Sequence, residues 1–406
     1  MRGRNLVGGL ERLWTANKKW ILIAACVLLA IVAAQRLSSG FHELVLNPKE
    51  ANDLHLRYRE VHEWFQGRSI DRFWPAVYPP ASLAMLWPFV GWESWPLARW
   101  LWALTTAAAL AWLGWFALKQ TGARGAWEKV AVVLLPLATY TVRADMVNGQ
   151  LGLHLLPPLL GGAVLLERSP ASWKRDAAVA GLFILALVKP TISVPFFLIL
   201  LLSRRPVRPA ALITAAYAAL TVLACRFQSE PLITLMLQWY RRAHGVVVNK
   251  AGETTHINIH SWLDALSLQK LVLPASLLIL ALLAVLLWTY RRSDVWLRLG
   301  LAAIVARVWS MHHRYDDVLL LIPLIALIRI AARWRAGAGR ETGALVMAGL
   351  LWLSLMVPAR FFFQGPAVRA VADSALTAVW LAAFAYLAYR ARREHRAALR
   401  TQPSPA

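Results

Sequence analysis

The stretch KLVLPASLLILALLAVLLWTY, residues 270–290, decides the fold class. From Leu271 to Tyr290 it carries no charged residue, so one α-helix can cross a hydrocarbon core about 30 Å thick. Further apolar runs occupy residues 20–36, 95–118, 127–142, 149–166, 176–189, 190–203, 208–225, 295–309, 317–331, 342–358 and 370–389. The sequence therefore predicts an all-α polytopic membrane protein with about twelve transmembrane helices, and residues 1–406 form one integral membrane domain.

The composition excludes the other broad classes. Hydrophobic residues make up 59% of the chain and charged residues 16%, whereas soluble domains carry roughly 25% charged residues. The same apolar content excludes a disordered chain, and two cysteines in 406 residues exclude a disulfide scaffold. The net charge of +23 raises the question of an anionic partner such as nucleic acid.

The location of the charge answers that question. Alternating the spans from a cytoplasmic N-terminus places residues 1–19, 119–129, 167–176, 203–208, 290–298, 329–341 and 390–406 on the cytoplasmic side. These segments hold 26 of the 44 basic and 7 of the 21 acidic residues, a net +19, and the rest of the chain carries +4. Short basic loops are typical of the cytoplasmic side, so both termini are predicted to be cytoplasmic. The pattern favours contact with anionic membrane lipids and provides no folded surface for nucleic acid.

Two long loops fall on the outer side, residues 37–94 and 226–269. In the first, Leu54, Tyr58, Val61 and Phe65 recur at helical spacing, which predicts an amphipathic helix over 53–66 on the membrane surface. Asp53 begins this helix and serves as its N-cap, as a functional carboxylate, or as both. The apolar stretch 81–90 is too short to span and is expected to dip into the membrane and return.

Other polar side chains gather at the outer ends of predicted spans. They are Arg143, Asn148, Gln150, Lys189, Arg307, His312, His313, Arg314 and Arg360. Ionisable groups at membrane depth are costly and indicate function, although for Arg314 and Arg360 interfacial snorkelling is an equal alternative. Cations and carboxylates on one face suit a substrate with a phosphate leaving group and a hydroxyl that needs a base. The histidines, His256 and His260 included, lack the Cys or Glu partners of a zinc site, so no metal is expected.

An ordered set of motifs resembles a known family. It consists of Asp53, Tyr58, Gly67, Tyr78-Pro79-Pro80, Asn148-Gly149-Gln150, Ala180-Gly181, Lys189-Pro190 and His313-x-Tyr315-Asp316. Over about residues 45–330 the chain resembles the bacterial membrane glycosyltransferases of family 87, the DUF2029 group. These have the GT-C architecture and include polyprenol-phosphate-mannose-dependent α-mannosyltransferases.

The resemblance implies an inverting sugar transfer at the outer face of the bacterial cytoplasmic membrane. Asp53 would be the general base, and His312 or His313 would assist it or hold the leaving phosphate. Lys189 would neutralise phosphate charge, and Asn148 and Gln150 would line the site. Further substrate contacts are expected from Tyr58, Tyr78, Arg143, Arg307, Arg314, Arg360 and His260.

The co-substrate implied is a polyprenyl-phosphate sugar, and no other cofactor is expected. Mannose is the expected sugar, with arabinose or another sugar open, and the acceptor is a glycolipid or glycan. Two other functional classes remain as alternatives to a glycosyltransferase of this family. A flippase or transporter would show internal repeats and charges at mid-membrane, and neither is found. An unrelated glycan ligase or polymerase would place its long outer loop late in the chain, whereas here the acid follows the first span.

Overall fold

The computed structural model describes residues 2–49, 51–70, 76–203, 207–249, 257–333, 342–357 and 365–400. Two residues considered above, His256 and Arg360, lie outside these ranges. Helices make up 83% of the structure, and no strand occurs among the described residues. The predicted all-α class is confirmed.

The helices follow the apolar runs. In chain order they are α1 (Arg2–Val45), α4 (Trp95–Thr121), α5 (Ala126–Leu137), α6 (Tyr140–Asn148), α7 (Gly152–Arg168), α8 (Trp173–Ala186), α9 (Pro190–Leu201), α10 (Val207–Cys225), α13 (Val272–Thr289), α14 (Val295–Val308), α15 (Leu321–Arg333), α16 (Thr342–Met356) and α18 (Pro366–Arg400). The run 127–142 is two helices, α5 and α6, bent by 45°. Lys189-Pro190 separates α8 from α9 because proline favours the first turn of a new helix.

Five of the described helices are long and apolar enough to cross a membrane, and α5 with α6 would make a sixth. The five segments are Lys19–Val45, Trp95–Thr121, Val207–Cys225, Gln269–Thr289 and Val368–Arg400. Shorter helices fill the space between them: every residue of the 14-residue α14 is buried. The chain is therefore a polytopic membrane protein, and the count of twelve crossings stays a prediction.

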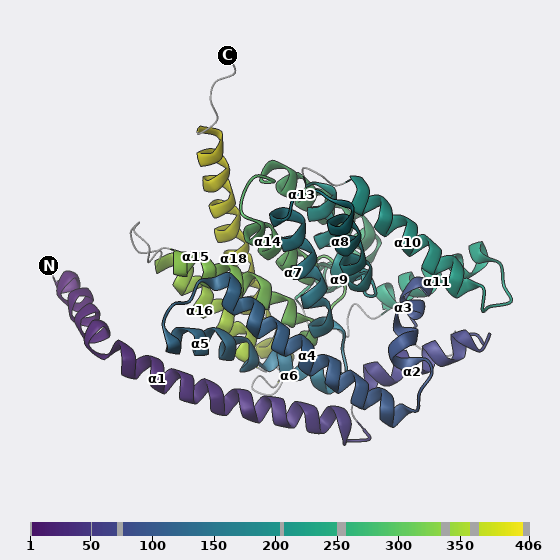
Figure 1. Cartoon of the computed structure of the whole chain (residues 1–406), viewed down its shortest axis with the longest axis horizontal. Helices are drawn as coiled ribbons and strands as arrows, with labels where there is room; N and C mark the ends of the chain where they lie inside the picture. Colours follow the sequence, from purple (N-terminus) through teal and green to yellow (C-terminus); the bar gives the residue numbers. More distant parts are fainter. Residues whose placement is uncertain are drawn as a thin grey trace, which may run out of the picture.

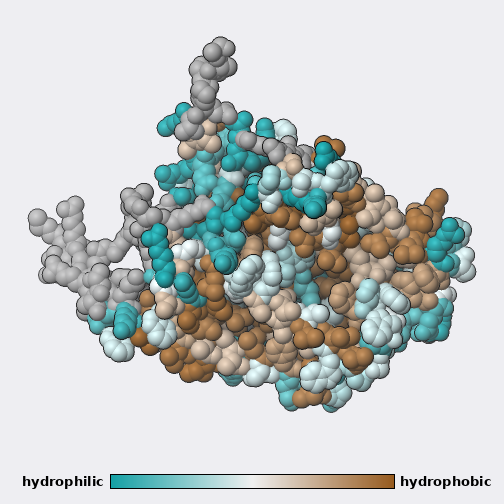
Figure 2. Space-filling view, viewed as in Figure 1, coloured by the Kyte–Doolittle hydropathy of each residue, from teal (hydrophilic) through white to brown (hydrophobic). Residues whose placement is uncertain are grey.

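Segments predicted to share a side of the membrane meet in the structure. The Gln120 side-chain oxygen accepts hydrogen bonds from Arg168 (2.8 Å) and Trp296 (3.3 Å). Its backbone oxygen accepts one from Arg329 (2.7 Å). These residues come from four of the loops predicted to be cytoplasmic. Hydrophilic side chains also gather around the projecting end of α18 (Figures 1 and 2).

The two long loops meet in the same way. The first contains α2 (Asn52–Phe65) and α3 (Pro80–Val90), and the second contains α11 (Leu232–Asn249), α12 (Ile259–Ala265) and the 3₁₀ turn η2 (Gln269–Leu271). Trp64 Nε1 donates to the Ala224 carbonyl (2.8 Å), Gln228 donates to the Trp64 carbonyl (2.6 Å), and Trp239 donates to the Val77 carbonyl (2.9 Å). The helices α2, α3 and α11 thus lie together at one end of the molecule (Figure 1).

The start of the first loop differs from expectation in two respects. Helix α1 continues to Val45, beyond the predicted end at residue 36. The N-cap of α2 is Ala51, in the left-handed region at φ 58°, and no side chain caps the helix. Asp53 is not the N-cap, because it lies inside the first turn. The N-cap alternative for this carboxylate is therefore wrong.

The contact between the two loops predicts the effect of replacing Trp64. In Trp64→Phe the buried Ala224 carbonyl loses the indole donor and keeps only the longer hydrogen bond from the Phe227 amide (3.3 Å). The loss of one hydrogen bond costs about 0.5–1.5 kcal/mol, so the thermal denaturation midpoint of the purified protein should fall. The matched control is Trp92→Phe, because Trp92 is 60% exposed and donates to the Pro88 carbonyl. Equal midpoints for the two variants would contradict the packing described.

Candidate functional site

The Asn-Gly-Gln motif follows α6 and lies where the end of that helix packs against α2. Gly149 ends α6 at φ +64°, and a Cβ there would come within 2.5 Å of the Leu54 Cβ. The Ala51 amide donates to the Val147 carbonyl (2.9 Å) across the same contact. Only glycine permits both this backbone angle and this approach, and the approach brings Gln150 beside Asp53.

Gln150 links two charged groups through its side-chain amide. Its Nε2 donates to the Asp53 carboxylate, and its Oε1 accepts from Lys189 Nζ (3.3 Å). Lys189 lies at the junction of α8 and α9 and forms an ion pair with Asp316 (Nζ to Oδ1, 2.7 Å). Four residues distant in sequence therefore form one connected network.

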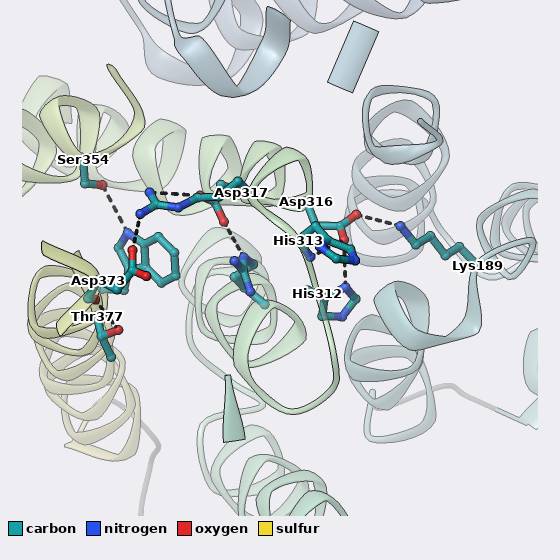
Figure 3. Close-up of polar contacts among 11 residues, drawn as sticks. Lys189, His312, His313, Asp316, Asp317, Ser354, Asp373 and Thr377 are labelled. Carbon is teal, nitrogen blue, oxygen red and sulfur yellow. Dashed lines mark hydrogen bonds and ion pairs between the residues drawn. The ribbon is translucent and has the colours of Figure 1, made fainter. Parts of the chain in front are cut away.

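The 3₁₀ helix η3 (Arg314–Leu320) supplies the other side of this network. Asp316 Oδ2 accepts from the His313 amide (3.3 Å) and is hydrogen-bonded to His312 Nδ1 (3.1 Å). Figure 3 shows Lys189, Asp316 and His312 converging from two elements. Burial raises the pKa of the Tyr315 hydroxyl, and the negative charge of Asp53 adds to this, so η3 approaches the carboxylate that Gln150 holds.

The Lys189–Asp316 pair is charged in the folded protein. Burial alone would raise the pKa of Asp316, but Lys189 and the His312 hydrogen bond outweigh it and lower that pKa. Asp316 is thus a carboxylate at neutral pH. Lys189 already has an anionic partner in Asp316. A phosphate bound at this site would therefore share the Lys189 ammonium with Asp316.

The structure distinguishes the two adjacent histidines. His312 is 1% exposed and fixed by Asp316. His313 is half-buried and interacts electrostatically with Asp53, although burial lowers its pKa. His313 is therefore the more accessible of the two imidazoles.

Two predicted cations belong to a separate buried cluster. Arg307 pairs with Asp317, and Arg314 pairs with Asp373 of α18. The Arg307 guanidinium lies 5.3 Å from the Trp380 ring centroid, also on α18. These contacts fasten α18 to η3, on the side of η3 away from Lys189 (Figure 3).

Other predicted residues have different partners. Asn148 donates to the Ala144 carbonyl of its own helix (2.8 Å), and Arg143 donates to Ser39 on α1 (2.8 Å). The Tyr58 hydroxyl donates to the Glu93 carbonyl (3.1 Å). His260 lies at a cavity and is bonded to Ser276 (3.0 Å). In the part of the chain that the structure describes, none of these four side chains forms a hydrogen bond or an ion pair with Asp53.

Arg57 and Glu60, which the sequence did not single out, lie on the same face of α2 as Asp53. Arg57 covers the Tyr78 ring (4.3 Å) and pairs with Glu60 (2.6 Å), so Tyr78 does border this region. Burial raises the pKa of Glu60 to about 7, and the charge of Asp53 adds to this. The positions 53, 57 and 60 have helical i, i+4, i+7 spacing, a signal that was available in the sequence.

These observations define a polytopic helical membrane protein with a buried, charged network. The family model of glycosyltransferase family 87 matches residues 76–312, more than half of the chain. The chain belongs to glycosyltransferase family 87, which supports glycosyltransferase activity. No curated protein and no solved structure matches it significantly. The matched range begins after Asp53 and ends at His312.

The Gly149 contact predicts a large effect from one added methyl group. Gly149→Ala would place Ala in the left-handed region, at about 1–2 kcal/mol, and would push Leu54 and α2 away from Gln150. We expect a lower thermal denaturation midpoint and reduced transferase activity. Gly181→Ala is the control, because no atom lies within 4 Å of the added Cβ on α8. A Gly149→Ala protein as stable and active as that control would contradict the prediction.

Proposed function

We propose that the protein is an inverting glycosyltransferase that moves a sugar, with mannose as the first candidate, from a polyprenyl-phosphate donor to a glycolipid or glycan acceptor. One observation carries the proposal. In a member of glycosyltransferase family 87, the Asp53 carboxylate accepts a hydrogen bond from Gln150, whose amide oxygen also contacts Lys189 of the Lys189–Asp316 ion pair.

Asp53 acts as the general base. A carboxylate has about four lone-pair sites, so the Gln150 donor leaves room for the acceptor hydroxyl, and Asp53 is half-buried rather than enclosed. As the hydroxyl oxygen forms its bond to the anomeric carbon, the bond from that carbon to the phosphate oxygen breaks. The hydroxyl proton passes to Asp53 and the electron pair leaves with the phosphate. A single displacement of this kind inverts the anomeric centre.

Lys189 and His313 stabilise the leaving phosphate. Lys189 Nζ has three donor positions, of which Asp316 and Gln150 use two. His313 donates a further hydrogen bond from its ring. The donor carries its own leaving group and membrane anchor, so this chemistry requires neither a nucleotide pocket nor a metal ion.

The site faces the outer side of the bacterial cytoplasmic membrane, and both termini are cytoplasmic. The distribution of Lys and Arg supports this orientation. Contacts among Gln120, Arg168, Arg329 and Trp296 agree with it, because they join loops of the basic side.

The role of Asp53 predicts the effect of removing its charge. Asp53→Asn keeps the shape and the Gln150 contact but takes away the proton acceptor, so transfer of labelled mannose from polyprenyl-phosphate-mannose should fall by about 10²–10⁴-fold. Glu63→Gln is the control, since Glu63 lies on the same helix as Asp53 and pairs with the exposed Arg68 that follows the helix. Near-normal transfer by a folded Asp53→Asn protein would exclude this mechanism.

The two histidines are expected to respond differently. His313→Ala should lower kcat without changing the thermal denaturation midpoint, because His313 is half-buried and acts on the reacting groups. His312→Ala removes a buried partner of Asp316, so its main effect should be a lower thermal denaturation midpoint. Both quantities are measured on the purified variants. A His313→Ala protein with unchanged kcat would assign the assisting role elsewhere.

A further inference from the structure

The carboxyl group of Asp145 is buried and takes no part in the steps above. Asp145 lies on α6, before Gln150 in the chain, and is 1% exposed. Its Oδ2 atom has no hydrogen-bond partner among the described residues. A polar group costs free energy when it is buried, so a carboxyl group in this position needs a structural or functional reason.

Asp145 contacts both ends of the short segment 150–153, which begins with Gln150. Its backbone carbonyl accepts a hydrogen bond from the Gln150 amide (2.9 Å), and its side-chain Oδ1 accepts one from the Leu153 amide (3.4 Å). Leu153 lies in the first turn of α7, where backbone amides have no acceptor within the helix. One residue therefore holds the segment at both ends, and this fixes the direction in which the Gln150 side chain leaves it.

Gly152 shows how closely the Asp145 carboxyl group packs on this segment. A Cβ atom at Gly152 would collide with Asp145 Oδ2 and with Val318 of η3. The backbone of Gly152 is not in the left-handed region, so the requirement for glycine is one of space. The elements α6, α7 and η3 therefore meet at this residue. Val318 follows Asp316 on η3, and Gln150 shortly precedes the glycine, so the contact links both halves of the charged network.

The Asp145 carboxyl group also lies within electrostatic reach of the ion pair. An ionised Asp145 interacts unfavourably with Asp316 and favourably with Lys189, so the two electrostatic effects oppose one another. The hydrogen bonds to the segment 150–153 have no such opposing contribution. Position and charge can be separated by experiment, because asparagine has the same shape and the same Oδ1 acceptor as aspartate without a negative charge.

We propose that Asp145 is a positioning residue, which fixes the segment 150–153 so that the Gln150 side chain reaches both Asp53 and Lys189. The importance of that reach rests on the proposed function, in which Asp53 is the general base. Asp145 is not itself a catalytic residue, because it acts through Gln150. Without the Asp145 side chain, the segment 150–153 takes other conformations and Asp53 loses the donor that orients it.

A double-mutant cycle tests the proposal. The purified variants Asp145→Ala, Gln150→Ala and the double variant are compared with the native protein for kcat, with labelled polyprenyl-phosphate-mannose as the donor, and for the thermal denaturation midpoint. Asp145→Ala should lower kcat by about 10–100-fold, because a displacement of about 1 Å near the reacting groups can cost that much. In the Gln150→Ala background the same change should lower kcat by less than about twofold, because the group through which Asp145 acts is absent. The fall in midpoint should be similar in both backgrounds.

Two further substitutions separate positioning from general damage. Asp145→Asn keeps the Oδ1 acceptor, so kcat should stay within about threefold of the native value. Asp176→Ala is the matched control, because Asp176 is a buried acid in the first turn of α8 and pairs with Arg175. Its effect on kcat should be equal with and without Gln150→Ala. If Asp145→Ala does not fold, Asp145→Leu, which keeps the branch at Cγ and loses the acceptor, replaces it in the cycle.

Equal losses of kcat from Asp145→Ala in the two backgrounds would overturn the proposal, as would an Asp145→Asn protein as impaired as Asp145→Ala. The Asp53→Asn assay is independent of the cycle and separates the two hypotheses. If Asp53→Asn retained transfer while the cycle showed coupling, the proposed mechanism would fail and the positioning role would stand. If Asp53→Asn abolished transfer while the cycle was additive, only the positioning role would be withdrawn.

Discussion

The Lys189–Asp316 ion pair, 2.7 Å long and partly to fully buried, is the contact on which the site depends. Two charges removed from water are retained only when further hydrogen bonds satisfy them, and here those bonds recruit the surrounding residues. Gln150 turns its amide oxygen to Lys189 and so presents its NH₂ group to Asp53. His312 and the His313 amide satisfy the other oxygen of Asp316. Removing either charge would leave the rest of this network without a fixed orientation.

This pairing changes the electrostatic picture of the site. The sequence predicted cations opposite carboxylates, with the cations available to bind a phosphate. In the structure Lys189, Arg307 and Arg314 each have an aspartate partner before any substrate binds. A site balanced in this way avoids uncompensated charge inside the membrane protein. A bound phosphate would then be stabilised because these cations rearrange their hydrogen bonds toward it. The site has no net positive charge from unpaired cations to supply that stabilisation.

Much of the architecture was readable from the sequence, because apolar runs and helical periodicity act locally. The amphipathic helix predicted at 53–66 is α2 at 52–65, and each predicted run corresponds to a helix or to a bent pair. The site was readable only in part. Gln150, Lys189 and Asp53 do meet, but Asn148 and Arg143 lie beside Gln150 in sequence and bond elsewhere. Which way a side chain leaves a helix end depends on the turn there, and Gly149 sets that turn through long-range contact with Leu54. No local pattern carries that information.

The adjacent residues Asp316 and Asp317 face opposite sides of η3, one toward Lys189 and the other toward Arg307. Arg307 on α14 pairs with Asp317, and His312 in the connection is bonded to Asp316, so the chain between α14 and η3 is restrained at both ends. An insertion or deletion of one residue before Asp316 would rotate η3 by about a third of a turn and move both carboxylates away from these partners. This connection therefore cannot vary in length as ordinary surface loops do, and related chains that keep the network should differ here by substitution alone.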